Sequence, residues 1–182
     1  MKTKNKLYKR LITATIILLM ILPMVNAQKE TTLNWHYSIT FSGNNMNPIL
    51  WFGESTNAND GQDTYDVPMP PMPPQPFLYA YFDSGLEEPY DKLMYDIKHY
   101  PDNYKVWNIK LLSSNGCNIV VNWEKVKGTE YKIVLLKDLE TGNTVNMKEA
   151  TNYEFEINSW SMYSLQIVCM FKTRFPYLVK KL

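Results

Sequence analysis

The sequence predicts an all-β fold, built as a two-layer antiparallel β-sandwich. Apolar residues recur with a period of two in several segments, and turn residues separate these segments at short, regular intervals. No segment sustains the 3.6-residue period of an amphipathic helix. Strands that each bury one face are expected to pack as two facing sheets.

The N-terminus has the parts of a signal peptide. Residues 1–10 contain five basic residues and no acidic one, and residues 11–22 are almost entirely apolar. Val25 and Ala27 supply small residues at the two positions that a signal peptidase reads. We expect cleavage between Ala27 and Gln28 and a secreted protein, extracellular or at the cell surface. An uncleaved anchor is the alternative, but the apolar run is shorter than the ~20 residues that span a bilayer.

Cleavage would remove 27 of the 182 residues and leave 155. This length is typical of one domain, which we place at residues 28–175, with a C-terminal tail at residues 176–182. The chain has 19 basic and 18 acidic residues, and five basic residues leave with the signal peptide. The mature chain then has 14 basic against 18 acidic residues, a net charge of −4. This charge disfavours nucleic acid as a partner, and no second long apolar segment predicts a membrane span.

The first half of the mature chain predicts three strands. Residues 33–41 alternate apolar and polar side chains, residues 49–53 form a short apolar run, and residues 77–82 are apolar on both faces, as in a central strand. A polar stretch from Glu54 to Asp66 predicts a loop. Residues 83–103 are rich in charge, tyrosine and proline, and their pattern indicates no element.

A proline-rich segment at residues 66–76 separates the second and third predicted strands. Its six prolines exclude a central strand and favour an extended polyproline II segment. We interpret it as a rigid strap that crosses the domain. A ligand for an SH3-type domain is the alternative, which export disfavours because such domains are largely intracellular.

The second half predicts a regular series of strands. The dipeptide Asn115-Gly116 is a hairpin signal, and the tetrapeptide at residues 140–143 predicts a further turn. Such spacing favours an Ig-like sandwich. The expected strands cover residues 107–111, 117–123, 131–136, 145–147, 153–157 and 163–171.

Several segments in order resemble a known type of module. They are Ile49 to Gly53, residues 57–63, Asp66-Val67-Pro68, residues 80–82, 107–109 and 121–123, and residues 138–147 with Thr141-Gly142 and Val145-Asn146-Met147. Together they resemble a β-sandwich module of secreted multidomain bacterial and archaeal proteins, often found ahead of type IX secretion sorting domains. The resemblance covers most of residues 39–170 and implies a location and a fold, not a reaction. We expect no sorting domain after residue 182.

No catalytic signature is apparent. His36 and His99 are the two histidines, and neither lies in a nucleophile elbow or a zinc-protease motif. We therefore expect no catalytic residue and no enzyme activity. A hydrolase of another type would require a deep pocket that contains His99 and two convergent carboxylates.

The polar loop contains candidate calcium ligands. Carboxylate and amide oxygens suit Ca²⁺, but their spacing is not that of an EF-hand. The alternative is a turn capped by its own Asn and Asp side chains. No other cofactor is expected. The candidate ligands are Asn57, Asn59, Asp60, Asp63 and Asp66.

Cys117 and Cys169 are the two cysteines of the chain. Export favours oxidation, and strand parity predicts that both side chains point into the core, so we expect a disulfide between them. Two buried free thiols are the alternative, because facing inward does not bring two Cα atoms within ~7 Å.

The tryptophans bear on function. Trp35, Trp107 and Trp123 alternate in phase with aliphatic residues and are expected in the core, whereas Trp160 lies between two serines and is expected to be exposed. The sequence favours an extracellular, non-enzymatic structural or protein-interaction module. The alternative is an accessory carbohydrate-binding protein that uses exposed aromatic side chains.

Overall fold

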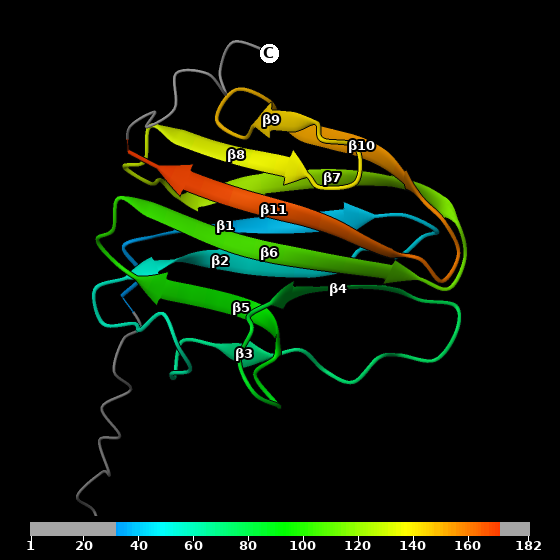
Figure 1. Ribbon diagram of the computed structural model, residues 1–182, viewed down its shortest axis with the longest axis horizontal. Coiled ribbons are helices and arrows are strands. Elements are labelled where there is room, and N and C mark those ends of the chain that lie inside the picture. Colours follow the sequence, from blue (N-terminus) through cyan, green and yellow to red (C-terminus); the bar gives the residue numbers. More distant parts are fainter. Residues whose placement is uncertain (1–31, 172–182) are drawn as a thin grey trace, which may run out of the picture. The chain divides into compact units, whose positions relative to one another are not determined.

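The computed structural model describes residues 32–171, and within them every regular element is a β-strand (Figure 1). The signal peptide with its cleavage site at Ala27 and Gln28, and the tail at residues 176–182, lie outside the described residues. The strands are β1 (Trp35–Ser42), β2 (Ile49–Ser55), β3 (Val67–Pro68), β4 (Leu78–Asp83), β5 (Lys92–His99), β6 (Tyr104–Ser113), β7 (Cys117–Lys127), β8 (Ile133–Asp138), β9 (Thr144–Asn146), β10 (Asn152–Ile157) and β11 (Met162–Met170).

The strands form one continuous sheet that is nearly closed into a barrel, whereas the sequence predicted two sheets (Figure 1). Its order is β10-β7-β1-β2-β5-β4-β6-β11-β8-β9, and β3 pairs with β5 beside this path. The link is β5, which arises from the segment that the sequence left without an element. Strand β5 pairs with β2 on one side and with β4 on the other. It therefore joins the half of the sheet that runs from β10 to β2 to the half that runs from β4 to β9.

The pairing of β2 with β5 also corrects the expectation of a purely antiparallel sheet, because these two strands run parallel. Parallel neighbours require a long crossover, whereas antiparallel neighbours need only a short turn. The chain between Ser55 and Lys92 provides such a connection, and it contains the strap.

The inward-facing side chains fill the space between the halves of the sheet. Trp35 of β1 packs edge-to-face on Trp107 of β6, with ring centroids 5.7 Å apart. The ring centroid of Phe52 on β2 lies 5.2 Å from that of Trp107. All three side chains are buried. The period-two pattern therefore predicted the faces of β1 and β6 correctly, and the expectation that Trp35 and Trp107 belong to the core is confirmed.

Side chains close the seam between the two end strands, β9 and β10. Trp123 Nε1 donates to the carbonyl oxygens of Met147, at 2.9 Å, and Ala150, at 3.1 Å. The ring of Phe155 stacks on that of Tyr163 with centroids 4.1 Å apart. Trp123 was expected fully inside the core, but it is half-buried because it lies at this seam.

The proline strap stays outside the main path of the sheet, as the sequence predicted, and only Val67 and Pro68 pair with a strand, β5. Met69 N donates to the Lys92 carbonyl oxygen at 2.8 Å, and the Tyr79 hydroxyl donates to the Pro70 carbonyl oxygen at 2.7 Å. These bonds hold the strap against β4 and β5. Among residues 32–171 no helix is long and apolar enough to cross a membrane.

The expected disulfide is absent, since Cys117 and Cys169 are both free thiols. Cys169 pairs with Lys105 near the start of β6, whereas Cys117 follows the turn at the end of β6. The eight residue-to-residue steps from Lys105 to Ser113 span ~26 Å in an extended strand, far beyond the ~7 Å that a bridge allows. The alternation of side chains along each strand predicted which face each cysteine occupies. The strand register, however, places the two cysteines at different heights along the barrel.

Thiol titration is expected to find two reactive thiols per chain in denatured, unreduced protein. In the folded protein Cys117, which is half-buried, should react first. Cys169 should be protected, because burial raises the pKa of its thiol well above the usual value. Absence of free thiols after denaturation would restore the disulfide.

Candidate functional site

The candidate calcium loop is held by its own carboxylates. Asp63 accepts hydrogen bonds from the backbone N–H groups of Asn59 and Tyr65, both at 2.6 Å, and Asp66 accepts from those of Asp63 and Ile97 at 3.1 and 3.3 Å. Asp66 is buried, and burial, together with the nearby Asp96, raises its pKa to about 6 despite these bonds. These contacts are those of a turn capped by Asp side chains.

Asp60 takes a different partner from the rest of the loop. Its carboxylate contacts Lys105 Nζ at 2.5 and 2.6 Å and accepts from the His99 N–H at 3.0 Å. Burial acts to raise the pKa of Asp60, but the bonds from Lys105 and His99 outweigh it and hold the pKa below its usual value. The side chain of Lys105 is only 5% exposed, so Asp60 neutralises a buried cation.

The five predicted calcium ligands therefore do not form a common cage. Asn57 and Asn59 are exposed, and the carboxylates of Asp60, Asp63 and Asp66 bind a lysine or backbone N–H groups. Within residues 32–171 no group of three or more His, Cys, Asp or Glu side chains has the geometry to hold a metal ion. The structure supports the alternative interpretation, a self-capped polar loop.

The two histidines occupy structural positions. His99 Nδ1 lies 3.0 Å from the Ala58 carbonyl oxygen, which fastens the polar loop to the end of β5. His36 packs beside Trp51 on the outer face of β1 and β2. Burial, and secondarily the charge of Lys127, lowers the pKa of His36.

A buried glutamate, which the sequence placed in a polar loop, lies inside the barrel. Glu54 accepts a hydrogen bond from Trp35 Nε1 at 2.6 Å. The Tyr131 hydroxyl lies 2.9 Å from Glu54 Oε1 and 2.8 Å from the Asp102 carbonyl oxygen. The hydroxyl proton of Tyr131 serves Glu54 or the Asp102 carbonyl oxygen, and a protonated Glu54 can instead donate its own O–H to Tyr131. Burial raises the pKa of Glu54 to about 7, although the hydrogen bonds from Trp35 and Tyr131 act to lower it.

A second buried carboxylate, Asp138, joins three parts of the sheet. Its Oδ2 accepts from the hydroxyls of Tyr153 on β10, at 2.7 Å, and Tyr163 on β11, at 2.6 Å. Its Oδ1 accepts from the N–H groups of Glu140 and Thr141 in the following turn. Burial opposes ionisation, but the tyrosine and turn hydrogen bonds prevail and lower the pKa of Asp138.

These two carboxylates were missed for different reasons. Glu54 continues the inward alternation of Leu50 and Phe52, so parity could have identified it as buried. Asp138 lies between the strand expected at residues 131–136 and the turn expected at residues 140–143, and only its contacts with Tyr153 and Tyr163 from later strands make it a hub. Both carboxylates are buried and hydrogen-bonded inside the scaffold.

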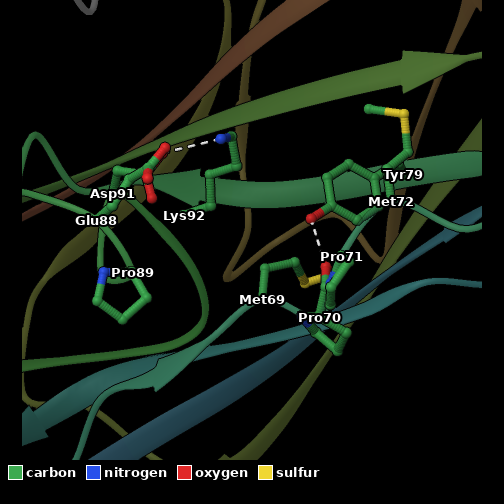
Figure 2. Close-up of a pocket in the computed structure, with 9 residues that line it drawn as sticks. All are labelled: Met69, Pro70, Pro71, Met72, Tyr79, Glu88, Pro89, Asp91 and Lys92. Carbon is green, nitrogen blue, oxygen red and sulfur yellow. Dashed lines mark hydrogen bonds and ion pairs between the residues drawn. The ribbon is translucent and has the colours of Figure 1, made fainter.

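An open pocket of about 340 Å³ lies between the strap and the turn that joins β4 to β5 (Figure 2). We call it the strap groove. In Figure 2 the Asp91–Lys92 ion pair, at 2.9 Å, and Pro89 lie on one side, and Tyr79 and Pro70 lie on the other. The lining residues are Met69, Pro70, Pro71, Met72, Tyr79, Glu88, Pro89, Asp91 and Lys92.

Hydrogen bonds within the turn between β4 and β5 fix the wall of the strap groove that lies opposite the strap. Ser84 Oγ donates to the Tyr90 carbonyl oxygen at 2.5 Å and accepts from the Leu86 N–H at 3.1 Å. The Ser84 N–H donates to the Asp91 carbonyl oxygen at 3.2 Å. The groove is therefore built on fixed backbone.

Exposed aromatic side chains occur elsewhere on the surface. Trp160 is 55% exposed, as the sequence predicted, and its ring makes a T-shaped contact with that of Phe77. Trp51 and Tyr95 stack on the outer face of β2 and β5 with ring planes 10° apart. Because these two rings cover each other, Trp160 is the better candidate for a sugar-stacking surface.

No protein-family model, no curated protein and no solved structure matches this chain. The resemblance to modules that precede sorting domains therefore stays a prediction.

Proposed function

We propose that this chain is an exported, non-enzymatic interaction module that binds a partner protein through the strap groove. The observation that supports the proposal is the groove itself, in which exposed apolar side chains of the strap face a turn fixed by Ser84. Met72 is 47% exposed at this surface. Exposed apolar side chains in a concave surface are typical of binding sites.

The use of the other polar groups agrees with a binding role. Glu54 and Asp138 are buried and hydrogen-bonded within the barrel, and Asp60 is paired with Lys105. Such groups hold the scaffold on which a binding surface is presented. The strap groove, by contrast, opens to solvent.

Retention experiments on the mature chain test the proposal. Immobilised residues 28–182 should retain a surface or secreted protein of the source cells, and Met72→Ala should abolish this retention. Met162→Ala is the matched control, because Met162 is 44% exposed on β11 and does not line the groove. Retention that Met72→Ala leaves unchanged would contradict the proposal.

Carbohydrate binding is the second candidate, and the exposed indole of Trp160 favours it. Specific retention of the chain by an insoluble polysaccharide, abolished by Trp160→Ala and unaffected by Met72→Ala, would support this function in place of the first.

Export is tested separately. Mass spectrometry of the secreted protein is expected to find Gln28, or its pyroglutamate form, at the N-terminus. Material outside the cell that still begins with Met1 would contradict cleavage, and protein retained inside the cell would contradict export.

A further inference from the structure

We propose that the occupant of the strap groove is an extended, arginine-bearing segment of the partner protein. This inference rests on the proposed function and adds the chemistry of the partner. Three properties of the groove point to that occupant. Its hydrogen-bond acceptors outnumber its donors, its rim is acidic, and its walls are apolar.

The strap supplies the excess of acceptors. Proline has no N–H group, so the strap presents backbone carbonyl oxygens with few N–H donors beside them. Of the strap residues in the groove wall, Met69 already donates its N–H to Lys92. Within the described part of the chain, the carbonyl oxygen of Pro70 accepts a bond from Tyr79, and those of Pro71 and Met72 accept none. A guanidinium group has five N–H donors and no acceptor, which complements this wall.

The turn beside the groove carries a net negative charge, and two of its carboxylates, those of Glu88 and Asp91, line the groove together with one cation, Lys92. The turn and its flanks contain Asp83, Glu87, Glu88 and Asp91, and the one basic residue among residues 83–92 is Lys92. Lys92 is paired with Asp91 at 2.9 Å. No ion pair within residues 32–171 involves Asp83, Glu87 or Glu88, and all three are outside the core. The uncompensated charge attracts a basic segment and repels an acidic one.

The walls suit the remainder of an arginine side chain. Thioether groups of Met69 and Met72 and the rings of Tyr79 and Pro89 line the groove. The three-carbon stem of arginine packs on such surfaces while its planar head reaches the carboxylates of the rim. A volume of about 340 Å³ accommodates individual side chains of an extended segment.

Fluorescence anisotropy with synthetic peptides tests this occupant. The probe is a fluorescein-labelled eight-residue peptide of alternating arginine and valine, measured at 20 mM and 500 mM salt. Its twin has citrulline, an uncharged analogue, in place of arginine. We expect the citrulline twin to bind at least tenfold more weakly and the affinity for the arginine peptide to fall at high salt.

Two variants of the mature chain locate the binding. Glu88→Lys, which reverses a charge on the rim, should weaken binding at least tenfold, and Met72→Ala should weaken it severalfold. The matched controls are Glu156→Lys on β10 and Met162→Ala on β11, both at exposed positions outside the groove, and they should bind as the parent chain does. Thermal unfolding of each variant confirms that it is folded.

Equal affinity for the arginine and citrulline peptides, no detectable binding of either, or full affinity in Glu88→Lys would overturn the inference. Sedimentation that shows a dimer abolished by Met72→Ala would make a second copy of this chain the occupant, and would also overturn it. Partner retention that depends on Met72 while the peptides fail leaves the proposed function standing. Retention of a partner protein that does not depend on Met72 would contradict the proposed function, whatever the result of the peptide experiment.

Discussion

Replacement of Glu54 by glutamine is expected to raise the free energy of unfolding at pH 8 by about 3 kcal/mol and to leave it nearly unchanged at pH 4. Glutamine reproduces the neutral, protonated form of the glutamate. Its carbonyl oxygen accepts from Trp35, and its amide donates to the Tyr131 hydroxyl, which then donates to the Asp102 carbonyl oxygen. The variant thus keeps the network and removes the ionisation.

The direction follows from the pKa values of the folded and unfolded chains. The pKa of Glu54 rises from 4.5 to about 7 on folding because the side chain is buried. Between pH 4.5 and pH 7 the folded state therefore binds more protons than the unfolded state, and stability falls as the pH rises. Below pH 4.5 Glu54 is protonated in both the folded and the unfolded state. Above pH 7 it is ionised in both, and the free energy of unfolding carries the full penalty of the buried charge.

Urea unfolding at pH 4 and pH 8 measures the effect. Glu154→Gln is the matched control, because Glu154 is exposed on β10, and it should change stability by less than about 0.5 kcal/mol at either pH. Some pH dependence will persist in Glu54→Gln, since burial also raises the pKa of Asp66, to about 6. A variant that is destabilised at pH 8 would mean that Glu54 is ionised in the folded protein and stabilises it.

Truncation of Asp138 to alanine is expected to lower the free energy of unfolding by about 4 kcal/mol. The change deprives two tyrosine hydroxyls and two N–H groups of the turn of their acceptor. Hydrogen bonds to a charged group are stronger than neutral ones, and the Tyr163 hydroxyl is left inside the barrel without a partner. The loss should also loosen the seam, because Tyr153 belongs to β10.

Urea unfolding of a small series of variants separates these contributions. Tyr153→Phe and Tyr163→Phe should each cost about 1–2 kcal/mol, and Asp138→Asn should cost less than Asp138→Ala because the amide oxygen still caps the turn. Glu140→Ala is the control, since Glu140 is exposed in the same turn. A cost below about 1 kcal/mol for Asp138→Ala would show that Asp138 is not a hub of the sheet.

The sequence by itself determined most of the strands, although not β5, and the faces of most of them. Alternation placed Trp35, Ile39 and Trp107 inside, and the Asn115-Gly116 turn separated β6 from β7. The prolines predicted correctly that the strap stays off the main path of the sheet. These features depend on local geometry: a strand alternates its side chains every residue, and proline lacks an N–H group wherever it stands.

Only the tertiary structure decided which strands are neighbours and at what register. The parallel pairing of β5 with β2 turned an expected sandwich into a nearly closed barrel. Register placed Cys117 and Cys169 at opposite ends of the barrel, and brought Tyr131 to Glu54 and Tyr163 to Asp138. Side-chain packing between strands distant in the chain selects these pairings, and a period-two pattern reports only the face of a side chain, not its height along the barrel or its partner.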